Sequence, residues 1–166
     1  MKNTGIIRKI DELGRIVIPK EIRQTMRINN YDDLAFFIED DTIVLKKYSV
    51  LNSLKSESDL IVSSVDDLVD CLIYISDKEK IITKGDIENE ELPEIFINIL
   101  LERKIYESLQ KEEIYFGTIQ KDGYFLVYPI IQNSDPIGLV ILQKNENITS
   151  QDKFFANVLK NIIENK

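Results

Sequence analysis

The sequence predicts an α+β protein in two parts, a small basic β module followed by a larger domain with an antiparallel sheet. Over about the first 50 residues, short β-branched runs alternate with turn residues. The remainder orders its patterns as helix, two strands, helices, three strands and helix, which is typical of an α+β domain. A chain of 166 residues is long enough for both parts, and we expect domains at residues 1–52 and 53–166.

The composition argues against most catalytic chemistry. Histidine is absent, which removes the commonest general base and metal ligand. The sequence also contains no glycine-rich phosphate loop and no paired cysteine motif. Its one cysteine, Cys71, lies in an apolar run and is expected in the core. We therefore expect a protein that is not an enzyme and that needs no cofactor and no metal.

Neither export nor membrane insertion is expected. No apolar run approaches the roughly 20 residues that a membrane-spanning helix needs. The first residues, Met1 to Gly5, lack the apolar core of a signal peptide. The sequence thus predicts a cytoplasmic protein without a membrane partner.

Charge is divided unevenly along the chain. The whole sequence has a formal net charge of −8, yet residues 1–30 hold seven basic side chains against three acidic ones. A basic segment joined to an acidic remainder indicates a local site for a polyanion, with little indiscriminate binding elsewhere. Charge alone is equally compatible with an ordinary solvated hairpin.

The basic segment has the pattern of a hairpin followed by a short helix. Residues 4–10 and 15–18 are β-branched runs, and the turn between them ends at Gly14, which can adopt positive φ. Pro19 then suits the first turn of a helix over residues 20–26. Apolar side chains on one side of this helix are Ile18, Ile22 and Met26, and basic ones on the other are Arg23 and Arg27.

A second strand pair completes the first part. Residues 34–38 and 42–48 read as strands joined by an acidic turn at 39–41. Four short strands and one helical turn make a poor core, and no disulfide or metal is available to reinforce it. We therefore expect dimerisation through exchange of strands.

These residues resemble the AbrB-type transition-state regulators. The resemblance covers residues 4–23 and ends with 43–48, and it places the turn glycine, the helix-start proline and the arginines in one register. It implies a domain-swapped hairpin barrel in which two chains present basic side chains to double-stranded DNA. The residues that match the family's DNA-facing positions are Arg8, Lys9, Arg15 and Arg23, with Lys20 and Arg27 as further phosphate contacts.

One position departs from the family pattern. Many members carry two consecutive arginines where this chain has Arg23 followed by Gln24, so one phosphate contact is weakened or replaced by hydrogen bonding. Arginine suits the remaining positions because its planar fork makes two hydrogen bonds to phosphate or guanine. Without a long recognition helix, we expect phosphate positioning and DNA deformability to supply much of the selectivity.

The second part opens with a helical pattern whose role stays open. Apolar residues recur at spacings of three and four, with one polar position, at Leu51, Leu54, Ser58, Ile61, Val65, Leu68 and Leu72. This seam is either an oligomerisation helix or an amphipathic helix packed on its own domain.

The rest of the second part alternates strands and helices. Strands are predicted at 71–76 and 80–84 with a turn at 77–79, then a helix near residue 91 marked by Ile95, Ile99, Ile105 and Leu109. Strands at 114–120, 124–132 and 137–143 follow, with turns at 121–123 and 133–136. Thr149 and Asp152 indicate a capping box before a final helix striped by Phe154, Phe155, Val158, Leu159, Ile162 and Ile163.

This order, with residues 128–131 leading through 135–138 into 139–142, resembles a GAF domain of α/β/α layering. The resemblance implies a sensor of an unidentified small molecule, and a scaffold that only holds dimers together is an equally economical interpretation. The acidic pairs Asp66-Asp67 and Glu90-Glu91 are interpreted as solvated faces and not as a metal site. We call residues 1–52 the head. Joined to this AbrB-type head, the second domain resembles sporulation regulators that form homotetramers.

The leading hypothesis is a DNA-binding transcription regulator of late, forespore-type sporulation genes, acting on the nucleoid. The alternative is an antitoxin-like interaction protein, because related swapped-hairpin heads occur in toxin neutralisers of the MazE type. Such proteins usually end in a flexible tail, whereas this chain continues into an ordered domain.

Overall fold

The computed structural model describes residues 4–30, 32–65 and 69–166. The predicted features Asp66-Asp67 and Leu68 lie outside these residues. The chain divides into two compact units, residues 1–48 and 49–166, whereas the predicted division lies after residue 52. The difference arises because helix α2 (Val50–Ser53) buries Leu51 in the core of the second unit.

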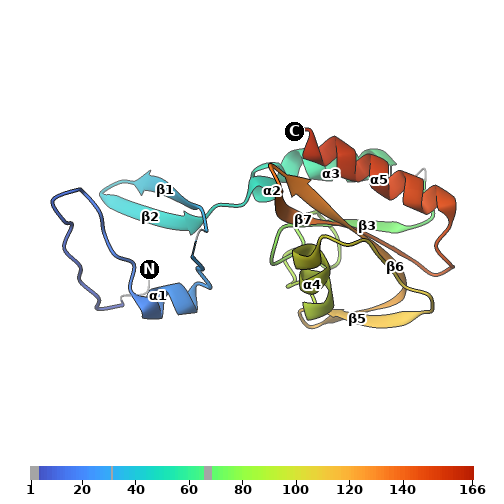
Figure 1. The fold of residues 1–166 in the computed structure, drawn as a ribbon, viewed down its shortest axis with the longest axis horizontal. Helices are drawn as coiled ribbons and strands as arrows, with labels where there is room; N and C mark the ends of the chain where they lie inside the picture. Colours follow the sequence, from blue (N-terminus) through green and yellow to red (C-terminus); the bar gives the residue numbers. More distant parts are fainter. Residues whose placement is uncertain (1–3, 31, 66–68) are drawn as a thin grey trace. The chain divides into compact units, whose positions relative to one another are not determined.

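The first unit contains a short helix and an antiparallel hairpin (Figure 1). Helix α1 (Lys20–Thr25) starts directly after Pro19, as predicted. Strands β1 (Leu34–Glu39) and β2 (Thr42–Lys47) pair from Leu34 opposite Lys47 to Glu39 opposite Thr42. The acidic turn is therefore a two-residue turn, and Asp40 adopts the left-handed φ of 52° that such turns require.

The predicted strands at residues 4–10 and 15–18 are wrong for the isolated chain. Residues 4–19, all described, form two arms around the turn but make no ladder with another strand. The turn itself is closed by hydrogen bonds from Asp11 N to Arg15 O at 3.0 Å and from Gly14 N to Asp11 O at 2.9 Å. Extended arms without a partner strand leave their apolar side chains in solvent, and Ile7 is 87% exposed.

The second unit is an antiparallel sheet covered by helices on both faces (Figure 1), which confirms the predicted α+β class. Strands run in the order β3-β7-β6-β4, and β5 pairs with the first part of β6. The strands are β3 (Leu72–Ser76), β4 (Tyr106–Glu107), β5 (Glu112–Phe116), β6 (Ile119–Gln132) and β7 (Asp135–Lys144). The helices beside α2 are α3 (Lys55–Val65), α4 (Glu94–Glu102) and α5 (Ser150–Glu164).

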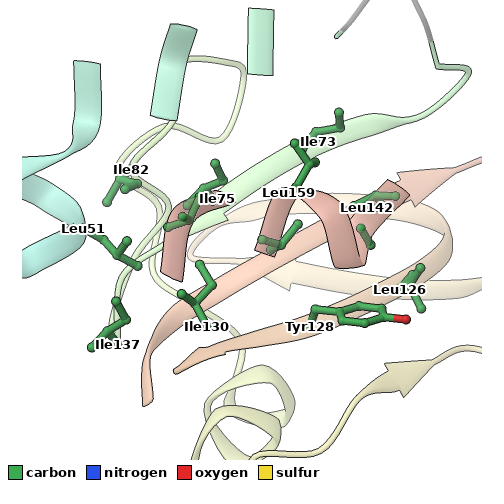
Figure 2. Close-up of a cluster of buried hydrophobic side chains, with 13 residues drawn as sticks. Leu51, Ile73, Ile75, Ile82, Leu126, Tyr128, Ile130, Ile137, Leu142 and Leu159 are labelled. Carbon is green, nitrogen blue, oxygen red and sulfur yellow. The ribbon is translucent and has the colours of Figure 1, made fainter. Parts of the chain in front are cut away.

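Alternation along the strands creates two separate cores. Side chains such as Ile73, Ile75 and Leu142 face α5, where they pack on Leu159 (Figure 2). Their neighbours in sequence point to the opposite face and pack against α4; they include Tyr74, Phe125, Val127 and Ile141. Because both faces are covered, the central strands read as continuous apolar runs instead of alternating ones.

The seam that begins at Leu51 is not one continuous helix. It is divided between α2 and α3, and Leu72 lies on strand β3, where it is 48% exposed. Ile61 and Val65 pack on the core next to α5. Among the described residues, the pattern therefore reflects helices packed on their own domain, the second of the two interpretations. Cys71 is partly buried and packs on the same core.

The predicted strand at 80–84 is wrong. The turn before it forms as expected, since Asp77 Oδ1 accepts hydrogen bonds from the backbone N of Glu79 and Lys80. Beyond it, only isolated bridges join Ser76 to Ile81 and Lys80 to Glu91. Ile82 N donates to Ile75 O at 2.8 Å, but Ile75 N donates to Thr83 Oγ1 at 3.0 Å. A side chain thus takes the place of one ladder bond, and no regular strand forms.

Two further boundaries differ from the prediction. The hairpin between β5 and β6 turns at Gly117, which has a φ of 54°, and the predicted turn at 121–123 lies inside β6. Helix α4 ends at Arg103 in the left-handed conformation, so Ile105 and Leu109 lie beyond it and are exposed. The side chains of α4 that reach the core are Phe96, Ile99 and Leu100, and Ile95 is 42% exposed.

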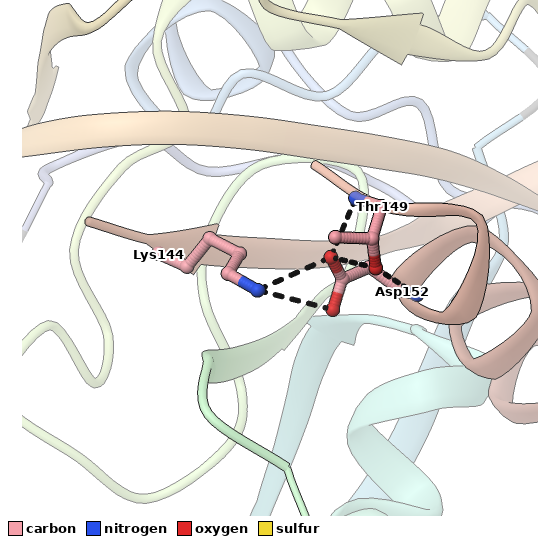
Figure 3. A network of polar contacts seen from close by, with 3 residues as sticks. All are labelled: Lys144, Thr149 and Asp152. Carbon is pink, nitrogen blue, oxygen red and sulfur yellow. Dashed lines mark hydrogen bonds and ion pairs between the residues drawn. The ribbon is translucent and has the colours of Figure 1, made fainter. Parts of the chain in front are cut away.

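The capping box of α5 is confirmed (Figure 3). Thr149 N donates to Asp152 Oδ2 at 2.7 Å, and Asp152 N donates to Thr149 Oγ1 at 3.3 Å. Lys144 on β7 forms an ion pair with the same carboxylate at 3.3 Å. The predicted stripe on this helix is only partly buried, since Phe154 and Ile162 are exposed while Leu159 and Ile163 are buried.

The described residues form neither a membrane span nor a metal cluster. No helix among them has the length and apolar character needed to cross a membrane. Within residues 4–30, 32–65 and 69–166, no group of three cysteine or acidic side chains could hold a metal ion. Of the pair Glu90-Glu91, Glu90 is partly buried and accepts a hydrogen bond from Thr118 N at 3.3 Å.

The ion pair at the start of α5 predicts a dependence of stability on pH. Burial opposes ionisation of Asp152, but hydrogen bonds from Thr149 and the ion pair with Lys144 outweigh it and hold its pKa below the usual value. The stabilisation is therefore present above pH 4 and is lost as pH falls through the lowered pKa. We expect Asp152→Asn to lower the free energy of unfolding by about 1 kcal/mol at pH 7. Urea unfolding at pH 7, 5 and 3.5 should also show a smaller acid-induced loss than in the wild type.

Glu146→Gln is the matched control, because it removes the same charge from an exposed side chain in the loop before α5. An acid-induced loss of equal size in the wild type and in Asp152→Asn would contradict this role for the carboxylate.

Candidate nucleic-acid interface

Three of the six predicted DNA-binding residues meet around helix α1. Lys20 and Arg23 lie three positions apart, on neighbouring turns of the helix, and Arg27 follows its end with a left-handed φ of 50°. Together they line a depression of about 390 Å³, whose other walls are Gln24, Ile28 and Asn29. The depression therefore presents three cations and two amide side chains to a ligand.

Arg23 is the most constrained of these cations. It is partly buried, and its Nη1 lies 3.5 Å from Asn30 Oδ1, at the outer limit of a hydrogen bond. Its Nε is buried and has no hydrogen-bond partner among the described residues. A buried N–H without a partner is uncommon and costs free energy, so a shift of this side chain that lets Nε meet an acceptor would be favourable.

The wall of the depression is held in place by the hairpin. Lys47 Nζ, at the end of β2, donates to Arg27 O at 3.0 Å and pairs with Asp32 Oδ2 at 3.3 Å. The same Asp32 oxygen accepts a hydrogen bond from Asn29 N at 2.8 Å. Lys47 is not among the six predicted residues, because this contact joins residues 20 positions apart and no local pattern indicates it.

The other three predicted residues lie on the arms around the first turn. Arg8, Lys9 and Arg15 are all exposed, and Arg8 Nη1 donates to Ile7 O at 3.2 Å. Arg15 forms an ion pair with Asp11 in which Nε lies 2.8 Å from Oδ2. The structure thus places the six basic residues in two sets of three, one around α1 and one on residues 8–15.

A large apolar surface accompanies the basic residues. The pairing of β1 with β2 puts Phe36, Ile38 and Ile43 on one face of the hairpin, and their exposed fractions are 68%, 82% and 68%. On the arms, Ile10 and Val17 are 68% and 74% exposed. Exposed apolar side chains gathered in this number are typical of a protein interface.

Comparison with known proteins relates the chain to a family of bacterial regulators. It is 38% identical over 153 residues to stage V sporulation protein T of Bacillus subtilis (strain 168), which covers 86% of this chain and 84% of that protein. The chain belongs to the same AbrB-type family. This membership confirms the resemblance that the register of residues 4–23 indicated.

The head alone matches further members of the AbrB-type family. Over 48 residues it is 56% identical to transition state regulatory protein AbrB and 52% identical to putative transition state regulator Abh, both of Bacillus subtilis (strain 168). These matches cover 29% of this chain and about half of each relative. Residues 7–50 also match the family described as antidote-toxin recognition MazE, bacterial antitoxin.

Proposed function

We propose that this chain is a sequence-selective DNA-binding transcription regulator. The observation that carries the proposal is the concentration of exposed cations in the first unit of an otherwise acidic chain. Lys20, Arg23 and Arg27 converge on one depression, and the second set of cations projects from the arms. A polyanion with regularly spaced phosphates is the ligand that two such sets match. This role belongs to a regulator and not to an enzyme.

The shape of the first unit favours recognition of the DNA backbone and its deformability. Helix α1 has six residues and would be about 9 Å long, too short to fill a major groove as a recognition helix does. Arginine forks on arms and on a helix end instead grip phosphates and scattered base edges. The preferred DNA sites are therefore loosely defined and favour easily deformed, AT-rich sequence.

The DNA-binding unit is a dimer. Among the described residues, the arms at 4–10 and 15–18 form no β-strand, and the apolar face of the hairpin is exposed. Interleaving two copies would supply both a partner strand and a cover for Phe36, Ile38 and Ile43. Two-fold symmetry then doubles each contact to DNA, so residues 1–52 act as the DNA-binding domain only in pairs.

The second part, residues 53–166, joins dimers into a tetramer. Phe154 and Ile162 project from α5 with exposed fractions of 71% and 42%, and they share one side of the helix with Val158.

On the other face of the sheet, the ring of Phe96 lies 5.6 to 6.2 Å from those of Tyr106, Phe116 and Phe125. Aromatic side chains thus fill the space between α4 and the sheet of this GAF-like domain, which favours a scaffold over a sensor of a small molecule.

The biological setting follows the relative that matches over both units. That protein is named for stage V of sporulation, and we extend this setting to the present chain as a regulator of genes expressed late in spore development. Such a regulator acts on the nucleoid in the cytoplasm. Mapping of bound chromosomal DNA during sporulation would test both the setting and the targets.

The second candidate function is neutralisation of a toxin, and one observation favours it. The matching family is described as antidote-toxin recognition, and it covers residues 7–50. An antitoxin would co-purify with a stoichiometric small protein from its native host. A chain that purifies free of such a partner and binds promoter DNA would support the regulator.

Binding to DNA should weaken steeply with salt. We expect Arg8→Ala to lower the slope of log affinity against log salt by about 0.9 for each phosphate that Arg8 neutralises, and by about twice that in a dimer. Fluorescence anisotropy with a promoter duplex at salt concentrations from about 50 to 300 mM measures the slope. Arg8 is exposed, so this substitution should leave the fold intact.

Lys111→Ala is the matched control, since it removes one exposed cation from the second unit. A slope that is unchanged in Arg8→Ala, or binding that is insensitive to salt, would contradict the proposed interface.

Dimerisation through the first unit predicts a specific effect of Ile38→Glu. Ile38 is 82% exposed in a single chain, so a charge there costs a monomer little, but it would be buried unpaired between two copies. We expect Ile38→Glu to dissociate the head dimer and to abolish DNA binding. Sedimentation velocity across a range of concentrations measures the first effect.

Leu109→Glu is the control, because Leu109 is 92% exposed in the second unit and the substitution introduces the same charge. An Ile38→Glu variant with the oligomeric state of the wild type would contradict this dimer.

A further inference from the structure

The turn between the two arms contains an acidic residue whose two carboxylate oxygens have different partners. Asp11 Oδ1 accepts hydrogen bonds from the backbone N of Leu13 at 3.0 Å and of Arg15 at 2.8 Å. Asp11 Oδ2 accepts a hydrogen bond from the Arg15 side chain, with Nε at 2.8 Å. One oxygen thus holds the backbone of the turn, and the other holds the guanidinium that projects from it.

This arrangement leaves one edge of the Arg15 guanidinium available. A guanidinium has five N–H donors in a fixed plane, and the ion pair with Asp11 is made through Nε. Among the described residues, no hydrogen bond engages its Nη1 or Nη2. The side chain of Arg15 is 71% exposed, so these two nitrogens face solvent as a ready pair of donors.

We propose that Asp11 is a positioning residue that orients Arg15 for a two-point contact with DNA through Nη1 and Nη2. The inference rests on the proposed DNA-binding function and deepens it by assigning a specificity role to an acidic residue. Arginine bound through Nε loses rotational freedom before DNA arrives, so less is lost on binding. Because the guanidinium is planar, fixing its Nε also sets the plane in which the remaining donors approach a phosphate or a guanine edge.

The protonation state of Asp11 supports this role. The backbone N–H of Arg15 and then its side chain lower the pKa of Asp11 below the usual value, so the carboxylate is ionised at neutral pH. An exposed pair of this kind adds little to folding stability. Its effect therefore lies in the geometry of Arg15 and not in the stability of the head.

Charge and positioning predict opposite effects when Asp11 is neutralised. If the carboxylate acts only as a negative charge close to DNA, its removal strengthens binding to every duplex. If it positions Arg15, its removal weakens the preferred duplex relative to a random one. The ratio of the two affinities separates these effects, because a change in overall charge acts on both duplexes alike.

The experiment uses the full chain with the substitution Asp11→Asn. Asparagine keeps an Oδ1 acceptor for the backbone of Leu13 and Arg15, so the turn persists, but it has no charge and turns an N–H₂ group toward Arg15 Nε. One probe is a duplex enriched by the wild-type protein from a random-sequence pool, and the other is the unselected pool. Fluorescence anisotropy at constant salt gives the affinity for each, and thermal unfolding checks the fold.

We expect Asp11→Asn to lower the ratio of selected to unselected affinity by about tenfold, the range expected when a two-point contact with a base edge no longer forms. The same substitution in an Arg15→Ala background should cause no further loss, because Asp11 acts through Arg15. Glu12→Gln is the matched control, since it removes one negative charge from the same turn, and it should leave the ratio unchanged.

Arg15→Lys tests the same geometry without altering Asp11. Lysine keeps the charge but lacks the planar fork, so the ratio should fall as it does in Asp11→Asn. An unchanged ratio in Asp11→Asn, equal strengthening on both duplexes, or an additive loss in the Arg15→Ala background would overturn the positioning role. A wild-type protein that enriches no duplex would overturn the proposed function itself, and the inference with it.

Discussion

The first unit cannot bury its own apolar side chains, and this constraint shapes the rest of the molecule. None of its described residues, 4–30 and 32–48, is buried. The hairpin offers one apolar face built by Phe36, Ile38 and Ile43, and the arms add Ile7 and Val17. A domain of fewer than about 70 residues is rarely stable without a disulfide, a metal ion or a partner chain. For this unit, the available partner is a second copy of the chain. In the proposed dimer, every basic side chain would be present twice, which suits the two-fold symmetry of a DNA duplex.

The second unit, in contrast, buries its own apolar side chains. Its sheet is covered on both faces, so Ile75 and Leu142 pack toward α5 while Tyr74 and Ile141 pack toward α4. Close approach is needed where β7 passes β3, and Gly138 supplies it, because a Cβ there would collide with Ser76 O and with Leu51. This unit therefore has a core of its own, which the first unit lacks.

Acidic residues in the first unit organise its cations. Asp32 connects Lys47 to the loop after α1, and Asp11 connects the turn to Arg15. Both carboxylates accept hydrogen bonds from backbone N–H groups and also form an ion pair with a basic side chain. A net positive segment therefore contains acids for a structural reason, since unpaired arginine and lysine side chains would be spread over many rotamers. In the proposed interface, these negative charges would reduce the total attraction for DNA while fixing the orientation of the cations.

The amino-acid sequence indicated the turns, helix starts and caps that depend on a few neighbouring residues. It did not indicate the contacts between distant segments. Pro19, the acidic turn between β1 and β2, and the pair Thr149 and Asp152 act over a few residues, so their patterns predicted the start of α1, the hairpin and the cap of α5. The register of the basic residues likewise indicated the family and the six candidate contacts. The strand at 80–84 failed because Thr83 bonds across to Ile75, which propensity cannot indicate.

The remaining differences have the same origin. Ile105 and Leu109 follow the apolar spacing of α4 but lie beyond Arg103, whose left-handed backbone ends the helix. The arms at 4–10 and 15–18 have strand-forming residues but form no strand in the described part of the chain, because a ladder needs a second chain segment at hydrogen-bond distance. Neither Lys47 beside Arg27 nor the convergence of three cations on one depression follows from spacing, since both depend on how distant segments fold back on one another. Residue identity determined which groups carry charge and where turns form, and tertiary packing decided which of those groups meet.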